Sequence, residues 1–200
     1  MENFLRIYIP LFYLAVILIT FALPSYLTWK KTGIKPITFG NSDNAYDYIG
    51  FAMKLLLALI FGLILIFSLF PIYYQYVLPI SYLNLSIFKI AGIVFMHGAM
   101  LWIGLAQYQM GISWRIGIDH LNKTTLVDSG LFAISRNPIF LGLLLCLLGL
   151  FLLIPSGFLL SVLLTTYFVI QIQVRLEEDF LKLQHDKKYV NYKDKVRRWL

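Results

Sequence analysis

The sequence predicts an all-α polytopic membrane protein with about five transmembrane helices, a C-terminal helical hairpin and a cytoplasmic amphipathic tail. Of its 200 residues, 60% are hydrophobic and only 14% are charged, whereas soluble domains are about half apolar and about a quarter charged. This composition argues against a soluble enzyme, a disordered chain and a disulfide scaffold. Four uncharged stretches hold 23, 34, 25 and 38 residues. Because one span needs about 20 apolar residues, the first three stretches fit one helix each and the last fits two.

The first two spans are expected at about Leu5–Leu27 and Gly50–Phe70. The first contains Pro10 and Pro24, both near its ends, where lost backbone hydrogen bonds matter least. It carries no small-residue cleavage site, which favours a retained span over a signal peptide. A polar loop, residues 28–48, connects the two spans.

The third span and the hairpin follow. Residues 71–81 are rich in tyrosine and uncharged, which is typical of the membrane–water interface. The third span is expected at about Ser86–Gln109. The apolar run Ile139–Ile172 is interrupted at 154–157 by Ile-Pro-Ser-Gly, a turn signal. Each half has about 16 residues, or about 24 Å of helix, so we expect a tight hairpin whose second helix continues into residues 173–178.

Basic residues indicate the orientation. The loops after the first and third spans each contain three Lys or Arg, whereas the loop after the second span and the hairpin tip contain none. The tail Gln173–Leu200 contains eight, against five acids. The positive-inside rule therefore predicts that the N-terminus lies outside and the C-terminus in the cytoplasm. The net charge of +7 then reflects topology and contact with membrane lipids, and we expect no nucleic-acid partner.

Two polar blocks flank the hairpin on the predicted cytoplasmic side. In the first, Asn137 and Pro138 suit the N-cap and first position of a helix, and free N–H groups at such a start near Arg136 favour an anion. In the second, Gln171, Arg175 and Glu178 fall on one helical face. Because the hairpin folds back, we expect both blocks to meet in one interfacial pocket.

Simpler interpretations exist for these residues. Arg175 and Glu178 suit an exposed ion pair, and Arg136 suits a positive-inside anchor. His97, in mid-span, suits helix packing. Trp102 and Trp114 suit packing or interfacial positions. The following small residues suit close helix contacts: Gly92, Ala99, Gly142 and Gly149.

Several motifs are absent from the sequence. It contains no Gly-x-Gly-x-x-Gly fingerprint after a strand, no Walker motif and no serine nucleophile elbow, so a nucleotide-like cofactor would not use a Rossmann site. The loop residues His120 and His185 lack paired ligands at metal spacing, so we expect no metal site. The single Cys146 lies in an apolar run, which predicts no disulfide.

Four elements in order carry a resemblance. They are Gly130-Leu-Phe-x-x-x-Arg-Asn-Pro-x-Phe-x-Gly142, the two-helix apolar stretch, Arg175-x-Glu-Glu178 and Tyr189-x-x-Tyr192. Together they resemble the C-terminal half of isoprenylcysteine carboxyl methyltransferases, which belong with the phospholipid N-methyltransferases among integral membrane enzymes that use S-adenosylmethionine. The resemblance covers about residues 105–200.

The sequence departs from the family pattern at two positions. Asn137 stands where the family has histidine, so a role that needs an imidazole does not carry over, and Phe140 stands where tyrosine is common. Residues 109–119, which include Asp119, resemble uncharacterised bacterial relatives, so we expect a bacterial inner-membrane protein. Such a protein would ordinarily lack prenylated protein substrates, so the methyl acceptor does not carry over with the fold.

We expect two parts: residues 1–110 with three N-terminal spans, and residues 111–200, in which the resemblance implies a cofactor-binding loop beside the hairpin and the cytoplasmic tail. The cofactor would be S-adenosylmethionine, with Glu178 binding its cationic amino-acid end beside Glu177, and two tyrosines helping to close the site. The implied cofactor-binding residues are Arg136, Asn137, Pro138, Glu178, Tyr189 and Tyr192.

The chemistry assigns Arg175 and Glu177 as catalytic residues. A carboxylate acceptor is already ionised at neutral pH, and Arg175 would hold it. An amine or thiol acceptor would need deprotonation, for which Glu177 is the nearest base. The enzyme mainly aligns the two reactants and excludes water. The acceptor, a lipophilic small molecule or lipid-anchored carboxylate, would enter from the bilayer.

Two other functions fit the composition. A sterol-reductase-like membrane enzyme would use NADPH, but it would need extra basic residues for the 2′-phosphate and usually more spans; cofactor competition would separate it. A non-enzymatic membrane protein would use its cytoplasmic charges only as anchors, and substitutions at Glu178 and Arg136 would then leave binding unchanged. Oligomeric state has no signature in the sequence.

Overall fold

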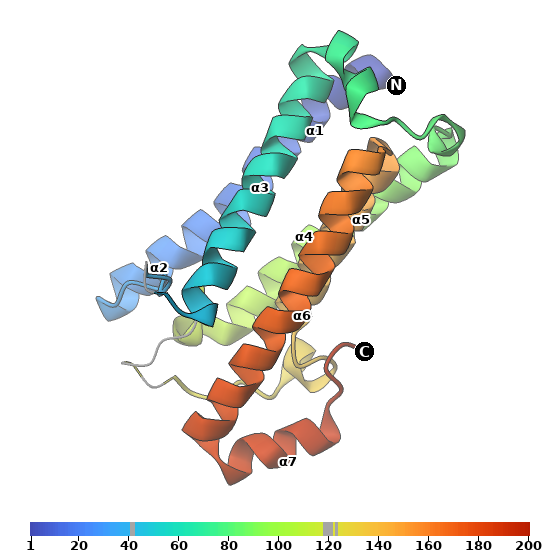
Figure 1. Ribbon diagram of the computed structural model, residues 1–200. Helices are drawn as coiled ribbons and strands as arrows, with labels where there is room; N and C mark the ends of the chain where they lie inside the picture. Colours follow the sequence, from blue (N-terminus) through green and yellow to red (C-terminus); the bar gives the residue numbers. More distant parts are fainter. Residues whose placement is uncertain (41–42, 118–121, 123) are drawn as a thin grey trace.

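The computed structural model describes residues 1–40, 43–117, 122 and 124–200, so Asp119 and His120 lie outside the described residues. The described chain forms helices joined by turns and short loops, with isolated bridges and no β-strand. Figure 1 shows the long helices side by side along one axis, with α7 and the C-terminus at the lower end and the N-terminus at the upper end. This confirms the all-α prediction.

The first span is a continuous helix made of α1 (Glu2–Val16), the π-helix η1 (Ile17–Ala22) and α2 (Leu23–Thr32). Pro24 has no N–H to offer to the carbonyl four residues before it, that of Thr20. The side chain of Gln107 on α4 donates to this carbonyl at 2.5 Å. The hydrogen bond that Pro24 removes from the first span is therefore replaced by one to a neighbouring span.

The second and third spans are α3 (Ala45–Leu69) and α4 (Ser86–Met110), joined by two 3₁₀ turns, η2 (Pro71–Val77) and η3 (Ser81–Leu83). The Asn44 side chain caps α3 by accepting from the Asp47 N–H at 2.9 Å. α3 begins five residues before the predicted span because its capped first turn lies outside the apolar core, whereas α4 matches its prediction to within one residue.

The predicted hairpin is α5 (Pro138–Leu153) and α6 (Gly157–His185), followed by α7 (Lys187–Lys195). At the turn, Ser156 caps α6 by accepting from the Leu159 N–H at 3.2 Å. α6 runs through the charged residues 173–178 without a break, as predicted, because no glycine or proline interrupts it.

Glycines bring α4 and α5 into close contact. A Cβ atom on Gly92 would lie 2.7 Å from the Gly149 carbonyl oxygen, and one on Gly149 would lie 2.8 Å from that of Gly92. A Cβ on Gly142 would lie 2.5 Å from Ile103. These distances leave no room for a side chain, which confirms that the small residues serve close packing.

Two other span residues also have packing roles. The His97 Nδ1 lies 2.9 Å from the Ile93 carbonyl oxygen and 3.3 Å from the Tyr8 hydroxyl, so the helix-packing interpretation is confirmed. The Trp102 Nε1 donates to the Pro138 carbonyl at 2.9 Å and holds α4 against the start of α5.

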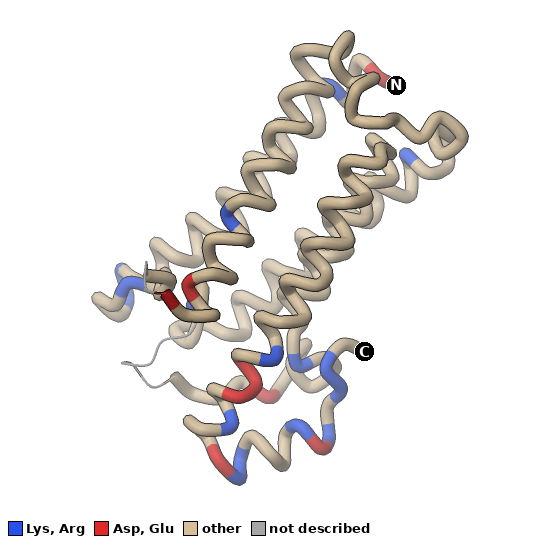
Figure 2. The backbone as a smooth tube through the Cα atoms, viewed as in Figure 1, with Lys and Arg blue, Asp and Glu red and all other residues tan. Residues whose placement is uncertain are grey.

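Among the described residues, four segments are long and apolar enough to cross a membrane, and α5 is a shorter apolar helix between α4 and α6. The four segments are Glu2–Thr32, Ala45–Leu69, Ser86–Ser113 and Gly157–His185. The protein is therefore an integral membrane protein of roughly five helices. In Figure 2 most charged residues gather at the lower end, around α7 and the lower part of α6. The predicted orientation and the division at residue 110 stay predictions.

Candidate functional site

A buried carboxylate organises the lower end of the bundle. Glu178 on α6 is only 6% exposed. Its Oε1 accepts from Arg136 Nη2 at 2.7 Å and from Arg198 Nε at 3.0 Å, and its Oε2 accepts from Arg198 Nη2 at 2.8 Å. A buried carboxylate is stable only when it is paired and hydrogen-bonded, and two guanidinium groups from distant parts of the chain meet this requirement. The carboxylate in turn raises the pKa of Arg198.

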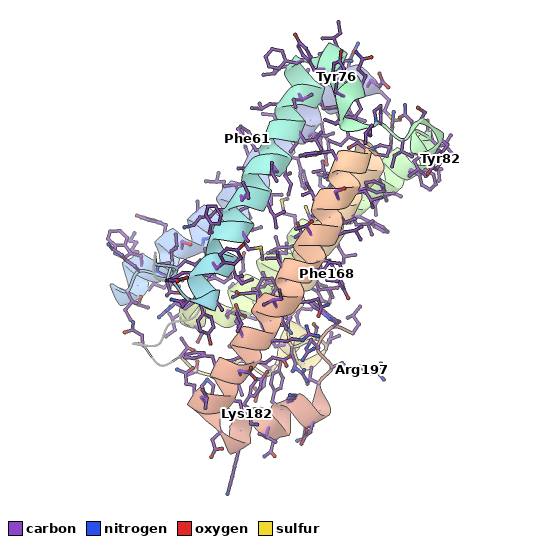
Figure 3. The ribbon with its side chains drawn as sticks, viewed as in Figure 1. Phe61, Tyr76, Tyr82, Phe168, Lys182 and Arg197 are labelled. Carbon is purple, nitrogen blue, oxygen red and sulfur yellow. The ribbon has the colours of Figure 1, made fainter. Side chains whose placement is uncertain are left out.

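Arg136 also holds the C-terminal segment, residues 193–198, against the loop before α5. Its Nη1 donates to the carbonyls of Lys193 and Val196 at 3.0 and 2.9 Å, and its backbone N–H donates to that of Arg197 at 3.0 Å. Figure 3 labels Arg197 on this segment and Lys182 on the lower part of α6. The segment is therefore fastened to the loop before α5, beside Glu178.

A hollow of about 540 Å³, measured with its open mouth, lies beside this ion cluster. Its walls come from the end of α4, Ser113, residues 124–127, η5 (Gly130–Ala133), Arg136 and Asn137 just before α5, α6 and α7. Six of the eight predicted site residues line this hollow: Arg136, Asn137, Glu177, Glu178, Tyr189 and Tyr192.

The two tyrosines of α7 form the floor of the hollow. Tyr189 is 2% exposed, and the Tyr192 hydroxyl donates to the Phe132 carbonyl on η5 at 2.6 Å. Burial raises the pKa of Tyr192 to about 12 and also raises that of Tyr189. Both phenols therefore stay protonated and uncharged at physiological pH. The hydrogen bond of Tyr192 holds α7 against η5.

The sequence profile of the phospholipid methyltransferase family matches residues 86–188, which is more than half of the chain. The chain belongs to the phospholipid methyltransferase family. The match begins with α4, covers Arg136 and Glu178, and ends just before Tyr189. Membership of this family supports a membrane methyltransferase rather than a reductase. No curated protein matches the chain significantly.

Asn137 and Pro138 occupy the N-cap and N1 positions of α5, as predicted. The Asn137 side chain does not cap the helix; its Nδ2 donates to the Arg198 carbonyl at 3.1 Å, and the Ser135 hydroxyl donates to the same carbonyl at 3.3 Å. Asn137 therefore lies against the C-terminal segment. Pro138 is buried and does not line the hollow in the part of the chain that the structure describes.

Arg175 lies apart from the ion cluster. Its Nη1 donates to the backbone and side-chain oxygens of Gln171 at 2.6 and 2.8 Å, and the side chain is exposed. Among the described contacts, Glu178 pairs with Arg136 and Arg198, so the simple ion pair with Arg175 is not formed. The three residues of the predicted face thus separate into an exposed pair and a buried acid.

Glu177 lines the hollow beside Glu178. The buried Gln173 donates its Nε2 to Glu177 Oε1 at 2.6 Å, so a neighbour one turn earlier orients this carboxylate. Among the described residues, no hydrogen bond reaches the other Glu177 oxygen, so this oxygen can accept one from a ligand.

Sequence reasoning missed Arg198, Gln173 and residues 124–127. Arg198 is one of eight basic residues in the tail, and nothing in the sequence distinguishes it from the others. Gln173 lies at i−4 from Glu177, a spacing that predicts contact on a helix. No potential metal-ligating group of three or more side chains occurs within the described residues.

Proposed function

We propose that this protein is an S-adenosylmethionine-dependent methyltransferase that acts on a lipophilic substrate at the cytoplasmic surface of the membrane. The observation that carries the proposal is the buried Glu178 carboxylate, which lies beside Arg136 and lines an open hollow. Membership of a methyltransferase family supports the reaction type.

The residues of the hollow fit the amino-acid end of this cofactor, which carries an ammonium and a carboxylate. Glu178 can bind the ammonium through Oε2, the oxygen that Arg198 contacts in this structure. Arg136 and the N-terminal end of α5 can bind the carboxylate, because both attract an anion. The apolar walls from Phe132 and Leu181 suit the uncharged part of the molecule.

The cofactor supplies an electrophilic methyl group on sulfur. The protein must then bring the acceptor into line with that methyl group and keep water out. The hollow lies where α4 and α6 leave their apolar stretches, and α7 lines it through Tyr189 and Tyr192. A lipophilic acceptor would therefore approach it from the membrane.

The two predicted catalytic residues suit different acceptors. Glu177 lines the hollow, so it is placed to take a proton from an amine or thiol. Arg175 is exposed and lies about one turn before Glu178 on α6, nearer the apolar part of the helix. There it can bind an anionic group of the acceptor outside the hollow. The position of Glu177 in the hollow supports its role as the proton acceptor, and the exposed position of Arg175 supports a substrate-holding role.

The test is S-adenosylmethionine binding to the detergent-purified protein by calorimetry, with Glu178→Gln compared with wild type. We expect binding to weaken by about tenfold or more, because the variant cannot pair a buried ammonium. Asp179→Asn is the matched control, since Asp179 is the exposed neighbour, and we expect it to bind like wild type.

Thermal unfolding of each variant checks that the fold is retained. Failure of the folded wild type to bind the cofactor, with and without added lipid, would count against the proposal. Equal binding by wild type and a folded Glu178→Gln would reject the role of Glu178.

A further inference from the structure

A second hollow lies at the opposite end of the bundle; with its open mouth included, its volume is about 410 Å³. It is formed by α1, the end of α3, the η2–η3 connection, the start of α4 and the turn between α5 and α6. Figure 1 shows these segments together at the upper end, beside the N-terminus. Its position separates it from the candidate methyltransferase site by the length of the spans.

Lys89 gives this hollow an unpaired positive charge. The side chain lines the hollow and the residue is only 7% exposed, yet no hydrogen bond or ion pair to it occurs among the described residues. The Lys89 ammonium is not among the fully buried, unpartnered side-chain atoms, so the aliphatic stem is buried while the charged end opens into the hollow. Ionisable residues within spans mark functional sites by default. The charge therefore points to an anionic ligand.

Glu2 gives the same hollow a negative charge. It lies in the first turn of α1 and lines the hollow, and no ion pair of 4.0 Å or less joins it to Lys89 within the described chain. The hollow thus presents a cation and an anion that do not neutralise each other directly. Such a site matches a ligand that carries both charges.

The other walls indicate that the ligand is a lipid. Leu5, Phe67 and Leu153 supply apolar surface, whereas Ser81 and Asn84 supply polar groups. The connection that forms the rim is rich in exposed tyrosine and leucine, which is typical of the membrane–water interface. A ligand at this depth has a polar headgroup and an apolar body.

We propose that this hollow binds the headgroup of a zwitterionic phospholipid, with its phosphate on Lys89 and its ammonium on Glu2. The glycerol and the upper acyl chains lie along the apolar wall. An anionic phospholipid binds less well, because Glu2 repels its additional negative charge. This site is separate from the methyl-transfer site and does not depend on the proposed function.

The experiment is native mass spectrometry of the purified full chain with added phosphatidylethanolamine, phosphatidylglycerol or inorganic phosphate. We expect wild type to retain phosphatidylethanolamine and to retain phosphatidylglycerol several-fold less. Lys89→Met, which keeps length but loses charge, should lower retention of phosphatidylethanolamine by about tenfold. Lys89→Arg should restore it.

Glu2 is exposed, so we expect Glu2→Gln to keep the fold. We expect it to bind phosphatidylethanolamine and phosphatidylglycerol about equally, because the repulsion of the second negative charge is gone. Displacement of the lipid by inorganic phosphate would overturn the proposal in favour of a free-anion site. Retention that does not depend on headgroup in both wild type and Glu2→Gln would also overturn it, even if Lys89→Met failed to fold.

Discussion

At the scale of single residues, Glu178 and its two arginines illustrate how a buried charge is made stable. Breaking a buried pair by removing one partner is costly because the other charge is left uncompensated. Here Arg136 precedes α5 and Arg198 follows α7, so the carboxylate joins three separate parts of the chain. A ligand that binds Glu178 would therefore compete with its arginines and change how the C-terminal segment is held.

The hydrogen bond of Tyr192 allows the attachment of α7 to η5 to be measured. Tyr192→Phe removes the hydrogen bond to the Phe132 carbonyl and leaves that carbonyl without its donor. We expect the free energy of unfolding to fall by about 1 kcal/mol, measured by denaturant titration in detergent. Tyr108→Phe is the control, since Tyr108 is 85% exposed. Equal stability of the two variants would show that the bond contributes nothing.

At the scale of elements, contact between α4 and α5 places the start of α5 beside the site. The two backbones touch at Gly92 and Gly149, and the Trp102 side chain binds the Pro138 carbonyl at the other end of α5. The N-terminal end of α5 is thus held at the depth of Glu178 by packing rather than by a cap. Because helices in a bilayer gain little from the hydrophobic effect, such close contact is the main source of their association.

Gly149→Ala should disturb this contact. Its new Cβ would lie 2.8 Å from a carbonyl oxygen and 2.7 Å from Met96, and overpacking of this kind typically costs about 1–3 kcal/mol. We expect a lower midpoint of thermal unfolding in detergent. Gly98→Ala is the matched control on α4, because nothing lies within 4 Å of its added Cβ. A Gly149→Ala midpoint equal to that of wild type would contradict the prediction.

At the scale of the whole molecule, the two ends of the bundle differ in charge and in the kind of hollow they carry. The lower end holds the ion cluster, α7 and most of the basic residues, and the upper end holds the hairpin tip and the uncharged connection between α3 and α4. The positive-inside rule places the end that is rich in basic residues on the cytoplasmic side of the membrane. It leads us to propose that the lower end faces the cytoplasm.

Labelling with a membrane-impermeant maleimide tests this orientation. In a Cys146→Ala background, which removes the single native cysteine, Tyr82→Cys on intact spheroplasts should react. Lys195→Cys should react only after the membrane is opened. The reverse pattern would mean that the candidate methyltransferase site faces outward.

The spans, the hairpin and its turn at 154–157 could be predicted because their signals are local. A run of apolar residues forms a helix in the bilayer wherever it lies in the chain, since each backbone group must bond within its own helix. The start of α5 at Pro138 could also be predicted, because the Asn-Pro pair is a local signal for a helix start. Glu178 and Arg136 were expected to meet because the hairpin brings both ends of its apolar stretch to one depth.

Other features depended on partners distant in the chain. Arg198 reaches Glu178, Gln107 replaces a bond that Pro24 removes, and Lys89 lies unpaired in a hollow made from five segments. Arg175 carries the same charge as Arg136 yet turns away from the hollow. Sequence by itself determined which segments cross the membrane, because hydrophobicity is a property of each segment. Only the tertiary structure decided which charges are buried together, because burial depends on how the helices pack.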